Sequence, residues 1–184
     1  MITPRRHFPL VTHPMTTAAQ RQLWTLSYQR VVGSARSELR SHAGRRRLDV
    51  QAADGTKIEF QQSKDSVPNT HSKELSHATG LMWVFSAINQ HFTTDLLITS
   101  RQGARANFTW TNPWRLIASC NARTMLDLGL SPQIGAHVLL EVDHFELGTG
   151  TAFGTAVLRD AQEFCHWMRD GHPLLPYAWT PRAA

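Results

Sequence analysis

Two carboxylates, Asp49 and Glu59, lie on either side of a predicted β-turn. The dipeptide Asp54-Gly55 favours a type I′ hairpin turn between two short alternating runs, residues 48–52 and 56–62. A hairpin with this tip places Asp49 opposite the stretch that begins near Glu59. The sequence therefore predicts that two acidic side chains meet at the open end of one hairpin.

Side chains alternate between the two faces of a strand, so the second run has one apolar and one polar face. We predict that Ile58, Phe60 and Gln62 share the first face, and that Glu59, Gln61 and Ser63 share the second. Carboxylate oxygens in such a place suit Mg²⁺ or Mn²⁺, which also bind water and substrate phosphate. The alternative is an exposed hairpin whose outer face is merely polar.

This spacing resembles the PD-(D/E)xK nuclease superfamily, in which an Asp precedes a strand-turn-strand and a Glu-x-Lys or Glu-x-Gln lies on the second strand. The longer pattern resembles the competence protein CoiA-like nuclease family and covers roughly residues 20–168. The shared segments, after the Asp before the hairpin, are Glu-Phe-Gln-Gln-Ser at 59–63, the helix motif at 73–77, Trp-Val-Phe at 83–85, Phe-Thr-Trp-Thr-Asn-Pro at 108–113 and Leu-Asp-Leu-Gly at 126–129.

The resemblance implies a restriction-endonuclease-like α/β core with a mixed sheet of about five strands flanked by helices. It also implies that Asp49, Glu59 and the backbone carbonyl of Phe60 hold Mg²⁺ or Mn²⁺. Gln61 takes the position usually held by Lys, where it can orient water or bind a phosphate oxygen. Lys73 and His77, four residues apart on a predicted helix, would contact the scissile phosphate and order a water, or else be two exposed polar residues.

Three positions depart from the family pattern. The family's His before Arg-Ala-Asp is Arg46, its upstream Trp-His is Trp24-Thr25, and its Arg-Glu-x-x-Tyr ends in His77. The predicted metal ligands and Gln61 are intact. These departures leave open a member that keeps the fold and has lost the chemistry.

A basic segment precedes the hairpin, and the chain carries a formal net charge of +5. Phosphate contacts dominate the affinity of proteins for nucleic acid, so these side chains predict DNA as the partner. The predicted DNA-binding residues are Arg40, Arg45, Arg46, Arg47 and Ser63. Arginines on a loop that only contact water are the alternative. Glu38, in the same segment, is either an accessory ligand or a solvated charge.

The chain has 184 residues, enough for one domain with a proper core. Its two cysteines, Cys120 and Cys165, predict thiols in a reducing, cytoplasmic setting rather than a disulfide. No apolar run reaches membrane-spanning length. We predict a flexible basic tail over residues 1–15, a nuclease-like domain over 16–170 and a loose tail over 171–184.

Three further local predictions concern secondary structure. We expect a helix over residues 18–33, capped by Thr16 or Thr17 and ended by Gly33. We expect a glycine-rich loop over 148–154 and an amphipathic helix over 158–168.

The sequence therefore predicts a metal-dependent nuclease acting on DNA phosphodiesters, with a link to DNA uptake, recombination or mobile elements implied by the resemblance. An inactive DNA-binding or recombination accessory protein on the same fold is the alternative. A basic globular protein with no nucleic-acid role is the third hypothesis.

Overall fold

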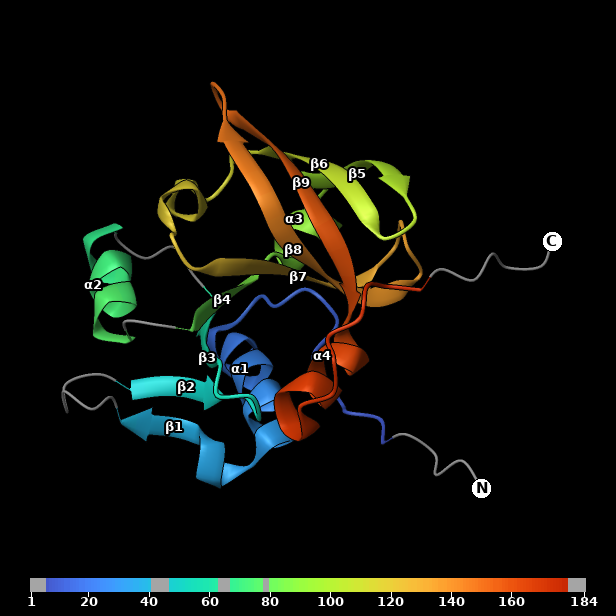
Figure 1. Cartoon of the computed structure of the whole chain (residues 1–184). Coiled ribbons are helices and arrows are strands. Elements are labelled where there is room, and N and C mark those ends of the chain that lie inside the picture. The colour runs from blue at the N-terminus through green and yellow to red at the C-terminus, as the bar shows by residue number, and fades with distance from the viewer. Residues whose placement is uncertain (1–5, 41–46, 63–66, 78–79, 179–184) are drawn as a thin grey trace.

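The computed structural model describes residues 6–40, 47–62, 67–77 and 80–178. Within them, helices flank a mixed sheet of nine strands (Figure 1). The helices are α1 Ala18–Val32, α2 Val67–His77, α3 Ile88–Phe92 and α4 Ala161–Asp170, with 3₁₀ turns η1 Ser34–Arg36 and η2 Arg115–Ser119. The strands are β1 Ser37–Arg40, β2 Arg47–Gln51, β3 Lys57–Gln61, β4 Leu81–Ser86, β5 Leu96–Gln102, β6 Arg105–Thr111, β7 Arg123–Ser131, β8 Ala136–Leu147 and β9 Thr151–Asp160.

The strands lie in the order β1-β2-β3-β4-β7-β8-β9-β6-β5. β1, β2 and β3 pair antiparallel, β4 lies parallel to both β3 and β7, and the remaining neighbours are antiparallel. The predicted mixed sheet with flanking helices is confirmed, but the prediction of about five strands is wrong. The basic segment before the hairpin forms the additional strand β1. In the C-terminal half, β7, β8, β9, β6 and β5 are successive neighbours in the sheet.

The glycine-rich stretch before α4 is strand rather than loop. β9 begins at Thr151, so the predicted loop over 148–154 is wrong in its second half. Gly154 faces Phe108 across the β6–β9 pair, and a Cβ at this position would lie 2.2 Å from the Phe108 ring. This glycine makes room for an aromatic ring. The strand continues to Asp160, whose side chain caps α4, so the predicted helix over 158–168 begins three residues too early.

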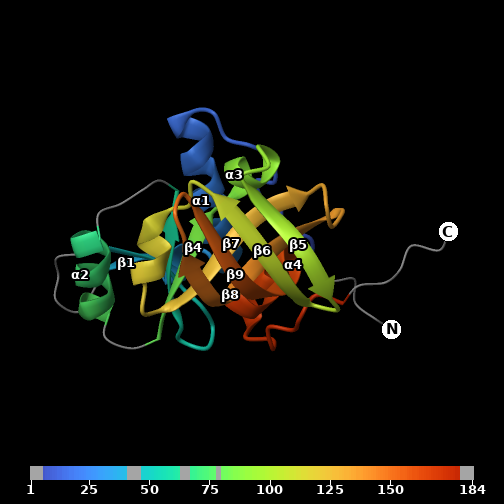
Figure 2. The ribbon, with the colours of Figure 1, turned by 90° about the horizontal axis from the view of Figure 1, so that it is seen from above.

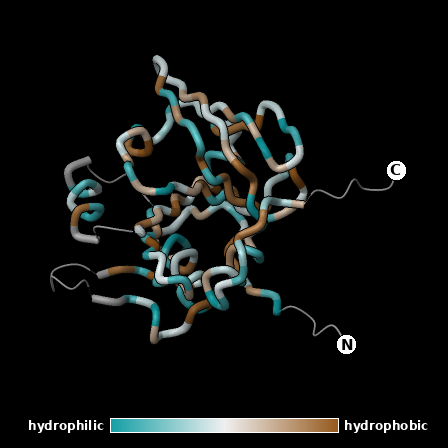
Figure 3. The backbone as a smooth tube through the Cα atoms, in the orientation of Figure 1, coloured by the Kyte–Doolittle hydropathy of each residue, from teal (hydrophilic) through white to brown (hydrophobic). Residues whose placement is uncertain are grey.

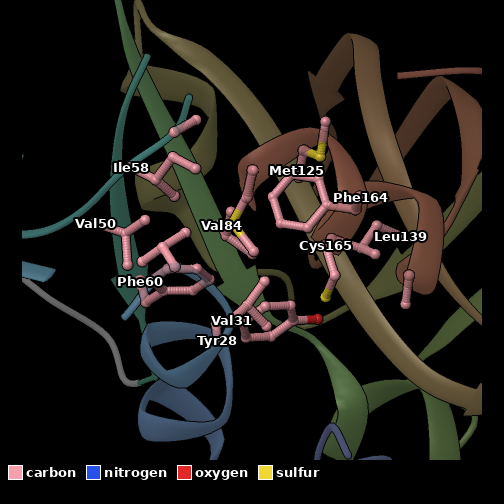
Figure 4. Packing of buried hydrophobic residues seen from close by; sticks show 14 of the residues in the cluster. Tyr28, Val31, Val50, Ile58, Phe60, Val84, Met125, Leu139, Phe164 and Cys165 are labelled. Atoms are coloured by element: carbon pink, nitrogen blue, oxygen red, sulfur yellow. The ribbon is translucent and has the colours of Figure 1, made fainter. Parts of the chain in front are cut away.

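One face of the sheet is covered by α1 and α4. The capping box of Thr17 and Gln20 starts α1 and Gly33 ends it, which confirms the predicted helix. The buried side chains of α1 belong to one hydrophobic cluster with buried residues of β2, β3, β4, β7 and β8. Figure 4 shows this cluster, in which the labelled residues are Tyr28, Val31, Val50, Ile58, Phe60, Val84, Met125, Leu139, Phe164 and Cys165.

The sheet curves around a second cluster on its other face. The alternate residues of β4, Leu81, Trp83 and Phe85, lie in one cluster with Leu96 of β5 and Trp110 of β6. β5 and β6 are several strands away in the sheet order, so these contacts require the sheet to bend. In Figure 1, β5, β6, β8 and β9 lie above β4 and β7, and in the view from above they lie over one another (Figure 2).

The sequence predicts a flexible start and a loose end, and the described parts of both, residues 6–15 and 171–178, make contacts with the domain. Phe8 and Met15 are 4% and 3% exposed. The Tyr177 backbone N–H donates to the Leu158 carbonyl at 2.8 Å. Buried aromatic and thioether side chains hold the first segment despite the prolines between them.

Both cysteines are free thiols, as predicted, with Cys165 buried and Cys120 half-buried. Hydrophilic and hydrophobic stretches are mixed along the backbone tube (Figure 3). Among the described helices, none is long and apolar enough to cross a membrane.

Candidate active site

The β2–β3 hairpin places the two predicted carboxylates on neighbouring strands. Val50 pairs with Ile58, and continuing this register by one residue sets Asp49 opposite Glu59. Val50 and Ile58 are buried in the cluster under α1, so Asp49 and Glu59 occupy the opposite face. Asp49 and Glu59 therefore lie across from each other on adjacent strands, as the hairpin pattern predicts; Ser63, predicted to share the face of Glu59, lies outside the described residues.

The turn at the hairpin tip differs from the predicted type I′ turn. The Gly55 N–H donates to the Ala52 carbonyl at 3.0 Å, and the Ala52 N–H donates to the Thr56 carbonyl at 2.8 Å. Gly55 has a φ of +89°, whereas Asp54 is not among the non-glycine residues with positive φ. These features define a three-residue loop, a type I turn followed by a left-handed glycine. Asp54 instead accepts from the Thr56 N–H and from Trp167 Nε1.

Asp49 is half-buried, and its Oδ2 accepts the Phe60 backbone N–H at 2.8 Å. Burial raises the pKa of this carboxyl above its ordinary value; the Phe60 N–H and the Lys73 charge offset part of the rise, and Glu38 adds to it. Glu38 lies opposite Asp49 across β1 and β2 and has a φ of +53°. The accessory carboxylate considered from sequence is therefore close enough to influence Asp49.

Glu59 is 3% exposed, and its charge is met by a lysine from α2. Lys73 Nζ lies 3.5 Å from Glu59 Oε2 and 5.5 Å from the centre of the Trp83 ring. Trp83 pairs with Glu59 across β3 and β4. The Lys73 ammonium group therefore lies beside the Glu59 carboxylate and over the ring of Trp83 on β4.

The oxygen atoms on this face fit a hard divalent cation by type. Asp49 and Glu59 supply carboxylates from neighbouring strands, and the backbone of Phe60 runs between Glu59 and Gln61. Mg²⁺ and Mn²⁺ take one or two carboxylates and complete their shell with water and substrate phosphate. Among the described residues, no three His, Cys, Asp or Glu side chains form a metal-holding group. The protein could thus supply part of a shell and not a closed cage.

Helix α1 supports the hairpin from the opposite face. Thr25 Oγ1 accepts from Gln62 Nε2, and Gln29 Nε2 donates to the Asp49 carbonyl at 3.5 Å. Thr25 and Gln29 are each 9% exposed, polar residues on the buried side of the helix. They bind α1 to the strand ends that carry the two carboxylates.

The structure brings together some of the predicted site residues and leaves others undescribed. Asp49, Glu59 and Lys73 meet, and half-buried Gln61 ends β3 on the face of Glu59. His77 ends α2, and the backbones of Arg40 and Arg47 pair across β1 and β2. Arg45, Arg46 and Ser63 lie outside the described residues.

A buried carboxylate that the sequence did not single out for chemistry links α1 to the sheet. Asp127 on β7 is fully buried, and its Oδ2 accepts from Trp24 Nε1 and Tyr28 OH, each at 2.7 Å. Its Oδ1 accepts the Gly129 N–H at 2.8 Å and lies 2.7 Å from His137 Nε2. Burial alone would raise the pKa of Asp127, but the His137 charge and these donors outweigh burial and lower it.

The only sequence signals for this network were two segments of the family resemblance, Trp24 with its neighbours and Leu-Asp-Leu-Gly at 126–129. Nothing in either segment indicated that they would meet. The network is closed to solvent, so we assign it to the core and not to the candidate site.

Comparison of the chain with family models, with curated proteins and with solved structures finds no match.

Proposed function

We propose that this protein is a divalent-metal-dependent nuclease that hydrolyses DNA phosphodiester bonds on a restriction-endonuclease-like core. The observation that carries the proposal is the pair of carboxylates, Asp49 and Glu59, on one face of adjacent strands with the Lys73 ammonium beside them. Two carboxylates can bind a metal ion and its water ligands, and an ammonium group can bind a phosphate oxygen. This set of charged groups therefore suits a phosphate ester and a metal ion better than an apolar ligand.

The order of elements supports the same proposal. An Asp on the first strand of a hairpin, Glu-x-Gln on the second, a following helix and then a Trp-Val-Phe strand is the order that the family resemblance predicts. Here β2, β3, α2 and β4 follow in that order, and Asp49, Glu59 and Lys73 come together from three of these elements.

Each residue has a role that its chemistry permits. Asp49, Glu59 and the Phe60 carbonyl would hold Mg²⁺ or Mn²⁺, which when bound polarises the phosphate and lowers the pKa of water. Lys73 would bind a phosphate oxygen, and Gln61 would orient the attacking water by hydrogen bonding. In the products, the water oxygen is bonded to phosphorus and the bond to the leaving sugar oxygen is broken.

Cleavage of defined DNA tests this proposal. Purified protein is incubated with linear duplex, single-stranded and branched DNA in Mg²⁺, in Mn²⁺ and in EDTA. Cleavage should require the metal. It should fall below detection in Asp49→Ala and in Glu59→Ala, while Glu146→Ala, a change at a side chain 73% exposed on β8, should behave as wild type.

Binding of DNA measured in parallel separates the carboxylates from the arginines. The apparent affinity should fall steeply as salt rises, because Arg40, Arg45, Arg46 and Arg47 would release counterions from phosphates. Both alanine variants should bind nearly as well as wild type. Near wild-type cleavage by either variant would contradict the assignment of the site.

One observation favours the second candidate function, a DNA-binding protein without catalysis. The Lys73 ammonium already neutralises Glu59, one of the two carboxylates that a metal ion would need. In that case wild-type protein would show salt-dependent DNA binding, no cleavage in either metal and no change on replacing Asp49.

A further inference from the structure

Helix α2, which carries the Lys73 of the candidate site, makes few contacts with the other described elements. In both Figure 1 and Figure 2 it lies at the outer edge of the molecule. Among the described elements, it packs most against η2. Its Leu75 side chain is 80% exposed, so burial of this apolar residue does not hold the helix in place.

Glu74 makes four hydrogen bonds from α2 to other parts of the protein, in addition to the contact of 2.9 Å between His71 Nε2 and the Ser119 carbonyl. Glu74 Oε1 accepts from Trp83 Nε1 at 3.1 Å, from the Asn121 N–H at 3.0 Å and from the Ala122 N–H at 3.2 Å. Its Oε2 accepts from Asn121 Nδ2 at 3.2 Å. Hydrogen bonds to an ionised carboxylate are stronger than those between neutral groups, and two consecutive backbone N–H groups make a natural anion cradle.

The same tryptophan contacts both Glu74 and its sequence neighbour Lys73. The indole N–H of Trp83 donates to Glu74, while its ring lies 5.5 Å from Lys73 Nζ. Lys73 in turn lies 3.5 Å from Glu59. Lys73 and Glu74 are adjacent on α2, so the contacts of Glu74 and the place of Lys73 depend on the same position of the helix.

We propose that Glu74 is a positioning residue of the candidate site, which docks α2 on Trp83 and on residues 121–122 and thereby holds Lys73 against Glu59. The proposal rests on the proposed function only where cleavage is concerned. The docking itself is a statement about the folded protein, and it can be tested whether or not the protein cleaves DNA.

The first test measures the reactivity of Lys73 toward an amine-acylating reagent. The folded protein is labelled, and mass spectrometry of its peptides gives the labelling rate of each lysine. Glu74→Ala should raise the labelling rate of Lys73 several-fold, because the amine leaves its carboxylate partner. Glu74→Gln keeps one acceptor and should give a smaller rise. Lys57 on β3 should label at an unchanged rate, and Glu146→Gln should leave both rates unchanged.

An unchanged Lys73 labelling rate in Glu74→Ala would overturn the proposal. A rise in the rates of Lys57 and Lys73 together would also overturn it, because general loosening of the fold would then explain the effect. Circular dichroism spectra and urea midpoints of both Glu74 variants, taken first, identify a variant that has unfolded, and Glu74→Gln then replaces Glu74→Ala.

The second test asks whether Glu74 acts through Lys73 on cleavage. If the protein cleaves DNA, Glu74→Ala should lower kcat by about tenfold to a hundredfold through misplacement of one group, with little change in KM for DNA. In a Lys73→Met background the same change should cost nothing further, because the two residues act as one unit. An equal loss in both backgrounds would refute the positioning role.

These two tests separate the failure of this proposal from the failure of the proposed function. Absence of cleavage by wild-type protein with a Lys73 labelling rate that responds to Glu74 would remove the nuclease assignment and keep the docking. Cleavage that is insensitive to Glu74, with an unchanged labelling rate, would do the reverse.

Discussion

Replacing Asp127 by asparagine should destabilise the protein by about 3–5 kcal/mol, the usual cost of breaking a buried charged network by removing one partner. The carboxylate accepts from Trp24 and Tyr28 at Oδ2 and from Gly129 at Oδ1. Asparagine offers one carbonyl oxygen, so its NH₂ must face one of these two sets of donors. The shape of the side chain is otherwise kept, which confines the effect to hydrogen bonding and charge.

The magnitude follows from the donors that lose their acceptor. With the NH₂ in the Oδ2 position, the Trp24 Nε1–H faces another donor, whereas the Tyr28 hydroxyl can rotate and accept. With the NH₂ in the Oδ1 position, the Gly129 N–H is left opposite a donor. Each buried donor left unsatisfied costs about 1–3 kcal/mol, and the remaining bonds lose their charge assistance.

Urea unfolding followed by tryptophan fluorescence measures this cost as a change in midpoint at constant m-value. Asp143→Asn, the same chemical change at an exposed position on β8, should lie within about 0.5 kcal/mol of wild type. A loss below about 1 kcal/mol for Asp127→Asn would refute the reasoning, because it would mean that the donors find other acceptors.

The difference in unfolding free energy between wild type and Asp127→Asn should change with pH in a defined direction. The pKa of Asp127 is lowered in the folded protein, so its ionised form adds stability above the unfolded pKa of about 3.9, and this stability is lost as pH falls through the folded value. This difference in unfolding free energy should have its maximum value at pH 7 and should become smaller in acid. A gap that is wider at pH 4 than at pH 7 would contradict the assigned shift.

Two further predictions concern Gln61 and Phe8. Gln61→Ala should lower the cleavage rate by roughly ten- to a thousandfold at saturating Mg²⁺, as for one positioned polar group, whereas Gln61→Lys should retain activity; wild-type cleavage by Gln61→Ala would remove this residue from the catalytic set. Phe8→Ala should cost about 3–5 kcal/mol in urea unfolding, because the ring is 4% exposed and packs on His166 and under Arg169. No change in the urea midpoint would mean that residues 6–15 behave as the loose tail that the sequence predicted.

The sequence by itself determined the features that depend on neighbours along the chain. Strand alternation and the turn residues at Asp54-Gly55 are local, so they placed Asp49 and Glu59 on one face without knowledge of the fold. The cap at Thr17 and the stop at Gly33 likewise depend on a few adjacent residues, and the helix between them forms as predicted. The turn type was wrong because Asp-Gly also suits a type I turn that ends in a left-handed glycine.

Tertiary structure alone decided which distant segments meet. The number of strands could not be predicted, because a glycine such as Gly154 looks like a loop residue until the ring of Phe108 lies over it. Lys73 of α2 lies 3.5 Å from Glu59 of β3, and the neighbouring Glu74 meets Asn121, 47 positions further along the chain. Asp127 joins Trp24 and Tyr28 across about 100 residues. Contacts of this kind arise from the packing of whole elements, and no local pattern records them, because the free energy that selects them is gained only when the core closes.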